Sequence, residues 1–124
     1  MTPTPTLIAI VDDEEPIRRA LRRLLASAGF QVDVFSDGDG FMRSLASRTP
    51  ECVVLDLHMP ESDGFAVMDK LVLLPNRIPV VVITGHDTVE SRQRVKEYGI
   101  TGYFRKPVDG QQLINAIQEA QKPS

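Results

Sequence analysis

Three short apolar runs constrain the fold of this 124-residue chain more than any other feature. They lie within residues 7–11 (LIAIV), 51–56 (ECVVLD) and 78–84 (IPVVVIT). Runs of this length with apolar side chains on both faces are typical of strands buried on both sides of a sheet. We therefore expect a sheet whose central strands are covered by other elements on both faces.

Amphipathic segments alternate with these runs. Two weaker strands are expected at residues 31–35 (QVDVF), which alternates as an edge strand does, and 100–104 (ITGYF). We expect helices from about Pro16 to Gly29, from Phe41 to before Pro50, from Gly64 to Pro75, within residues 85–99, and over about 109–121. Five strands alternating with five helices predict an α/β, doubly wound (βα)5 flavodoxin-like fold, with a parallel sheet in the order 2-1-3-4-5. Residues 1–124 are expected to form one domain, with residues 1–6 as a loosely ordered lead.

Charge and composition exclude several classes of protein. The formal net charge of −3 argues against a nucleic-acid-binding surface. No apolar stretch is long enough to span a membrane, and the N-terminus resembles no secretory signal, so we expect a cytoplasmic protein. The one cysteine, Cys52, allows no intramolecular disulfide and is expected to be a small buried hydrophobe.

Polar side chains follow four of the predicted strands. Asp12 and Asp13 follow the first strand, Asp56 and Thr84 end the third and fourth, and Lys106 comes just after the fifth. Because the carboxyl ends of parallel strands meet at one edge of the sheet, these side chains should converge there.

This set of side chains predicts a particular chemistry. Two like charges 4 Å apart repel by roughly 4 kcal/mol at an effective dielectric of about 20, so three carboxylates require cations nearby. Lys106 supplies one, and a hard divalent cation such as Mg²⁺ (or Mn²⁺) could supply the rest. Such a pocket would bind a phosphoryl group, and Asp56 could act as the nucleophile that forms an acyl phosphate.

Each residue taken alone has a simpler interpretation. Asp12 and Asp13 could cap a helix, Asp56 could be a turn residue, Thr84 a strand residue and Lys106 a solvated lysine. Only their joint placement at the strand ends favours a site.

The motifs VDDEEPIR, VVLDLHMPESDG, VVVITG and YFRKP, in this order and spacing, resemble those of response-regulator receiver domains of bacterial two-component signalling. The resemblance covers about residues 7–120. It implies a phosphorylation-switched signalling protein that catalyses only its own phosphorylation and dephosphorylation. It also implies a histidine kinase or phosphotransfer protein as the phosphodonor.

The resemblance assigns a role to each residue. Asp56 is the phosphoacceptor, and Asp13, Asp56 and the backbone carbonyl of His58 hold Mg²⁺, with Asp12 acting through water. Thr84 and Lys106 contact the phosphoryl group, and Tyr103 moves inward as Thr84 moves. The resemblance also implies a cis Lys106–Pro107 bond and an output face formed by the last two helices and the strand between them.

Three further residues differ from the common pattern. His58 and His86 stand two positions after Asp56 and Thr84, and they either tune the lifetime of the acyl phosphate or are solvated loop residues. Tyr98 occupies a position where receivers often have alanine, and we expect its bulk to alter the output face.

The first helix carries Arg18, Arg19, Arg22 and Arg23, which form either a solvated face or a docking surface for the phosphodonor. Downstream, the resemblance implies a separate protein or a C-terminal output domain, and a monomer or a phosphorylation-dependent dimer. Two other function classes remain. One is a receiver-like module that binds partners without phosphorylation. The other is a haloacid-dehalogenase-type phosphohydrolase, which would place an Asp where Glu14 stands and would carry a cap domain.

Overall fold

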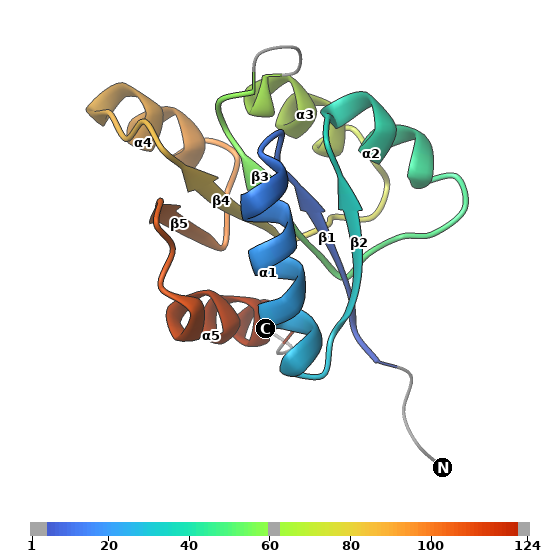
Figure 1. Cartoon of the computed structure of the whole chain (residues 1–124). Coiled ribbons are helices and arrows are strands. Elements are labelled where there is room, and N and C mark those ends of the chain that lie inside the picture. Colours follow the sequence, from blue (N-terminus) through green and yellow to red (C-terminus); the bar gives the residue numbers. More distant parts are fainter. Residues whose placement is uncertain (1–4, 60–62, 122–124) are drawn as a thin grey trace.

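The computed structural model describes residues 5–59 and 63–121, in which five strands alternate with five helices (Figure 1). The strands are β1 (Leu7–Val11), β2 (Gln31–Phe35), β3 (Cys52–Asp56), β4 (Val80–Thr84) and β5 (Gly102–Arg105). The helices are α1 (Glu15–Ser27), α2 (Gly38–Ser44), α3 (Gly64–Leu71), α4 (Val89–Lys96) and α5 (Gly110–Ala120).

The strands form one parallel sheet in the order β2-β1-β3-β4-β5. The three apolar runs are therefore its three central strands, as predicted. The alternating segment QVDVF is β2, at one edge. This order confirms the doubly wound α/β fold.

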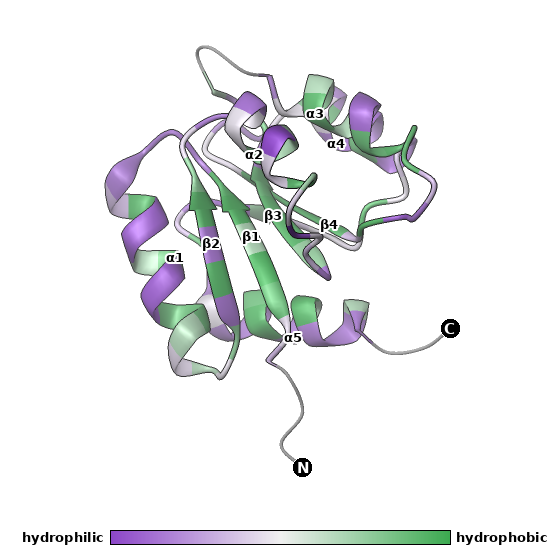
Figure 2. Cartoon of the chain, turned by 90° about the vertical axis from the view of Figure 1, so that its right-hand side faces the viewer, coloured by the Kyte–Doolittle hydropathy of each residue, from purple (hydrophilic) through white to green (hydrophobic). Residues whose placement is uncertain are grey.

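Helices cover both faces of the sheet, and the alternation of side chains along each strand divides the core in two. Ile8 and Ile10 of β1 pack with residues of α1 and α5 on one face. Ala9 and Val11 pack with residues of α2, α3 and α4 on the other. Figure 2 shows the apolar strands between helices whose outer surfaces are hydrophilic.

Several element boundaries differ from the sequence-based prediction. The second helix was expected to begin at Phe41, but α2 already begins at Gly38 because the Asp37 side chain accepts a hydrogen bond from Gly40 N and caps the helix. Helix α3 ends at Leu71 rather than continuing to Pro75, and Val72, just after its end, is 60% exposed. Strand β4 begins at Val80, after a proline that has no N–H to donate.

The expectation for residues 1–6 falls mostly outside the described residues. Thr6 is described, and its carbonyl accepts a hydrogen bond from Gln31 N at 2.9 Å, so the chain is already fixed there. Among residues 5–59 and 63–121, no helix is long and apolar enough to cross a membrane.

Candidate functional site

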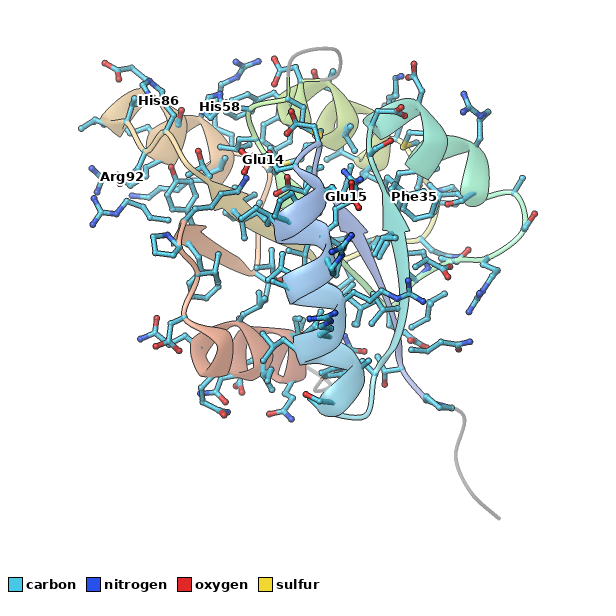
Figure 3. The ribbon with its side chains drawn as sticks, viewed as in Figure 1. Glu14, Glu15, Phe35, His58, His86 and Arg92 are labelled. Carbon is cyan, nitrogen blue, oxygen red and sulfur yellow. The ribbon has the colours of Figure 1, made fainter. Side chains whose placement is uncertain are left out.

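Three carboxylates meet at the carboxyl ends of β1 and β3, as the sequence predicted. Asp12 and Asp13 follow β1, Asp56 ends β3, and one oxygen from each lies within 4.8 Å of the others. Asp12 and Asp56 are buried, whereas Asp13 is partly accessible. In Figure 3, Glu14 and His58 lie at this same end of the sheet.

Lys106, just after β5, reaches across to these carboxylates. Its ammonium nitrogen lies 2.9 Å from Asp12 Oδ2, 3.3 Å from Asp56 Oδ2 and 3.7 Å from Glu14 Oε1. Burial alone would lower the pKa of Lys106, but its contacts with Asp12 and Asp56 outweigh burial and raise it. The side chain is therefore a fixed cation. The peptide bond after it, Lys106–Pro107, is cis, as predicted.

The carboxyl group of Asp56 is strongly perturbed. Burial, together with the negative charge of Asp12, raises its pKa from 3.8 to about 6 even though Lys106 opposes the shift. Its Oδ1 accepts a hydrogen bond from His58 N at 3.2 Å. One ammonium therefore does not fully offset the charges of the buried carboxylates.

The donor set fits a hard divalent cation. Two buried oxygens, Asp12 Oδ2 and Asp13 Oδ1, have no hydrogen-bond donor among the described residues, although Asp12 Oδ2 forms the ion pair with Lys106. Clustered carboxylate oxygens that lack donors are the ligands that Mg²⁺ prefers. The nearby residues 60–62 lie outside the described part of the chain.

Thr84 is fully buried at the end of β4, and its hydroxyl oxygen accepts a hydrogen bond from His86 N at 3.0 Å. Val82 pairs with Tyr103 in the sheet register, so Thr84, two residues further on, lies on the same face of the sheet as Tyr103. Tyr103 is half-buried against the core on the α4 side, and its hydroxyl donates to Asp87 Oδ1 at 2.8 Å.

The two histidines come together although they lie 28 positions apart in the sequence. Both are exposed, and their ring centres are 5.5 Å apart at an interplanar angle of 85°. His58 also lines an open hollow of about 580 Å³ that extends to Phe65 and Arg94. The histidines are exposed as solvated residues would be, but they contact each other beside the carboxylates.

Tyr98 does not point toward α5. Its hydroxyl donates to Asp69 Oδ1 on α3 at 2.5 Å, and its ring lies 6.3 Å from that of Phe65. Phe65 is itself covered by the guanidinium of Arg94, 3.9 Å from the ring centre. Tyr98 therefore connects the end of α4 to α3, and its side chain lies between these two helices.

Sequence reasoning missed two residues near the site. Gly64 packs so closely that a Cβ there would lie 2.6 Å from the Asp56 carbonyl oxygen and 2.8 Å from Leu57 Cα. Asp87 holds the Tyr103 hydroxyl and also pairs with Arg92. The glycine that opens a helix after the Asp56 loop was a visible signal for the first, but nothing in the sequence pairs Asp87 with Tyr103.

Comparison with known proteins identifies the family. The family model described as the response regulator receiver domain matches residues 8–118. The chain belongs to this family. It is 33% identical over 122 residues to response regulator protein TmoT of Ectopseudomonas mendocina, covering 98% of this chain and 56% of that protein. It is 30% identical over 114 residues to the DNA-binding transcriptional regulator NtrC of Salmonella typhimurium, covering 92% of this chain and 24% of that protein. The chain thus spans about half or less of these relatives.

Solved structures agree. A response regulator receiver protein from Burkholderia phymatum superposes with a TM-score of 0.82 at 35% identity, covering 93% of this chain and 94% of that one. The response regulator StyR superposes with a TM-score of 0.81 at 34% identity, covering 94% of this chain and 59% of that one. These similarities confirm that the chain is a receiver domain of two-component response regulators.

Proposed function

We propose that the chain accepts a phosphoryl group on Asp56 and thereby switches a signalling surface. The observation that carries this is the buried Asp56 carboxylate, 3.3 Å from the ammonium of Lys106 and within a cluster of three aspartates. A carboxylate in such a setting is a nucleophile with a positioned cation beside it. Apart from making and losing its own acyl phosphate, the domain would act on no other substrate.

The reaction is a phosphoryl transfer. An Asp56 oxygen forms a bond to phosphorus while the bond from phosphorus to the donor breaks, and the donor keeps that electron pair. With a phosphohistidine donor, the leaving imidazole nitrogen takes up a proton, and the product is an acyl phosphate. Lys106 would contact a phosphoryl oxygen, and Thr84 would donate its hydroxyl hydrogen to another.

The acidic cluster would hold Mg²⁺. Asp13, Asp56 and the carbonyl of His58 would bind it directly, and Asp12 would act through a coordinated water. Its charge would offset the negative charge of the phosphoryl oxygens as they transfer.

Phosphorylation would be read at α4, β5 and α5. The added charge of about −2 would draw Thr84 toward the phosphoryl group, since its hydroxyl lies at the carboxyl end of β4 and can donate to a phosphoryl oxygen. Tyr103, on the same face of the sheet, would move into the space that Thr84 leaves. The core would then pack in one way before phosphorylation and in another way after it. The surface formed by α4, β5 and α5 would differ between these two states.

The phosphodonor would be a histidine kinase or a phosphotransfer protein. Arg22 and Arg23 are exposed on α1, the helix that follows Asp12 and Asp13, whereas Arg18 donates to the Asp12 carbonyl at 2.8 Å and Arg19 pairs with Glu15 at 2.6 Å. Reversing Arg22 and Arg23 to Glu should slow transfer from a kinase and spare small phosphodonors. Equal slowing of both would rule out docking at this surface.

The relatives suggest what the signal reaches. NtrC is described as a DNA-binding transcriptional regulator, and the match covers 24% of it. By analogy, the surface of this domain would act on an attached or separate output protein in the cytoplasm. Activation by dimerisation and activation as a monomer both fit this arrangement.

Intact mass after incubation with Mg²⁺ and acetyl phosphate tests the proposal, beside the variant Asp56→Asn. The proposal requires one added phosphoryl group on the wild type and none on the variant. A label that persists in Asp56→Asn would instead favour a phosphohydrolase with its nucleophile at Asp12 or Asp13. No label on either protein, with a cognate kinase also inactive, would favour a binding module that works without phosphorylation.

A further inference from the structure

Tyr103 is tied by its hydroxyl to a carboxylate outside the strand that carries it. Asp87 Oδ1 accepts the hydroxyl hydrogen at 2.8 Å and also lies 3.1 Å from Arg92 Nε on α4. The Asp87 side chain is only 15% exposed, whereas that of Arg92 is 53% exposed. Burial, and then the bond to Asp87, raise the pKa of Tyr103 to about 12. Asp87 thus joins β5 to α4.

The same short loop joins Asp87 to Thr84. Asp87 lies three positions after Thr84 in the sequence. The intervening His86 donates its backbone N–H to the Thr84 hydroxyl at 3.0 Å, so the loop and that hydroxyl are in contact. Thr88, the residue after Asp87, caps α4 by accepting a hydrogen bond from Ser91 N at 3.0 Å. A movement of Thr84 would therefore pull on a segment that contains Asp87 and leads directly into α4. In Figure 3, His86 and Arg92 lie at the α4 side of the molecule.

We propose that Asp87 is a positioning residue that transmits the movement of Thr84 to Tyr103 and to α4. In the structure described here, Asp87 holds Tyr103 in place by its hydroxyl. When Thr84 moves toward a phosphoryl group, it draws the loop away from β5, and the bond between Asp87 and Tyr103 breaks. The inference rests on the proposed function, because it assumes that Asp56 is phosphorylated.

The physical reason is the cost of leaving a half-buried carboxylate without its donor. A hydrogen bond to a charged group contributes more than one between neutral groups, so Asp87 favours the position of Tyr103 seen here. Its exposed partner Arg92 replaces little of that loss, because exposed ion pairs contribute weakly. Asp87 would thus hold the resting arrangement until a phosphoryl group at Asp56 offers a stronger attraction to Thr84.

The composition of the chain allows a direct test. It has two tyrosines and no tryptophan, so in the variant Tyr98→Phe all tyrosine emission comes from Tyr103. A hydrogen bond to a carboxylate quenches tyrosine emission. The comparison is Tyr98→Phe against Tyr98→Phe/Asp87→Asn and Tyr98→Phe/Asp87→Ala, each with and without Mg²⁺ and beryllofluoride as the phosphoryl mimic. The fluorine resonance of bound beryllofluoride reports occupancy of the Asp56 site independently of emission.

A matched control is available at the other end of α4. Asp69 is the acceptor for the Tyr98 hydroxyl, so Asp69→Asn in the Tyr98→Phe background removes a carboxylate that no longer has a tyrosine to hold. It should leave the emission of Tyr103 unchanged.

We expect Tyr103 emission to be quenched in the Tyr98→Phe protein and to rise when the mimic binds. In the Asp87→Ala protein, emission should already be high and should not respond, while the mimic still binds. The Asp87→Asn protein should also be brighter, because its carboxylate is gone while its fold is least disturbed. Emission that is equal with and without Asp87, or a response to the mimic that persists in Asp87→Ala, would overturn the inference. A Tyr98→Phe protein that is folded but binds no mimic would instead point to failure of the proposed function.

Discussion

The ammonium nitrogen of Lys106 lies 2.9 Å from Asp12 Oδ2, and the two side chains are 11% and 0% exposed. They lie near opposite ends of the sequence. They meet because β1 and β5 are parallel, so their carboxyl ends lie at the same end of the sheet. Lys106 gives the resting site a fixed positive charge before any phosphoryl group or metal arrives.

Removing the ammonium should destabilise the metal-free protein. Lys106→Met would leave Asp12 and Asp56 facing each other with no cation between them, and breaking a buried pair costs about 3–5 kcal/mol. We expect a loss of about 2–4 kcal/mol in the free energy of unfolding, because Asp56 can take up a proton to relieve part of the repulsion. Urea unfolding of both proteins in EDTA measures this loss of stability.

Mg²⁺ and a matched lysine supply the controls for this variant. Mg²⁺ should stabilise Lys106→Met more than the wild type, because its charge replaces the one removed. The exposed Lys70 makes a suitable comparison, and Lys70→Met should change stability by less than about 0.5 kcal/mol. A Lys106→Met protein as stable as the wild type in EDTA would show that the ion pair contributes nothing net.

The raised pKa of Asp56 predicts a dependence of stability on pH. Well below the ordinary pKa of 3.8, the carboxyl is protonated in both the folded and the unfolded state. As pH rises from about 4 to about 6, the unfolded carboxyl ionises while the folded one keeps its proton, so stability falls. In EDTA, Asp56→Asn should therefore be more stable than the wild type by about 1–3 kcal/mol at pH 7.5, and by about half as much at pH 5. Equal stability of the two proteins at both pH values would contradict the raised pKa of Asp56.

Gly64 should accept no side chain. A Cβ there would meet backbone atoms of Asp56 and Leu57 at 2.6 and 2.8 Å, so the segment that carries the phosphoacceptor would have to move. Gly64→Ala should lower stability by about 1–3 kcal/mol. It should also slow phosphorylation by at least about tenfold, because a small misplacement of a reacting group is costly.

Gly110→Ala is the comparison for this change. The atoms nearest to its Cβ would be side-chain atoms of Leu24, two of them at 3.1 Å, and these can shift. Its phosphorylation rate should equal that of the wild type. If Gly64→Ala phosphorylates as fast as Gly110→Ala, the close packing beside Asp56 has no bearing on the reaction.

The contact between His58 and His86 predicts a change in the lifetime of the acyl phosphate. A ring contact worth about 0.5–1.5 kcal/mol would hold both imidazoles over the site and hinder the approach of water. Replacing either with Ala should speed hydrolysis about two- to tenfold, and the double variant should add little because each single change already breaks the contact. Loss of the phosphorylated mass with time measures it, and unchanged rates would show that the histidines are solvated bystanders.

The sequence was sufficient to predict the strand order and the convergence at the strand ends. Apolar runs such as LIAIV and VVVIT can only be buried on both faces, and parallel strands place their carboxyl ends together. That geometry predicts that four side chains lie at the carboxyl ends of the strands, and the structure places them there: Asp12, Asp56, Thr84 and Lys106.

Side-chain partners on flanking loops and helices could not be predicted in this way. Asp87 and Tyr103 are 16 positions apart and meet only because β4 and β5 are neighbours and the loop after β4 turns back over β5. Tyr98 could have faced either α5 or α3, and its bond to Asp69 depends on how α4 packs on α3. Helix α2 was placed too late, because the Asp37 cap allows a helix to start among glycines.

The most direct test of the central claim is to locate the phosphoryl group on the chain. Borohydride reduces an aspartyl phosphate to homoserine, and peptide mapping of the protein treated with Mg²⁺ and acetyl phosphate would show where that residue forms. We expect homoserine at position 56 and at no other acidic residue. Homoserine at position 12 or 13, with Asp56 intact, would contradict the assignment of Asp56 as the phosphoacceptor.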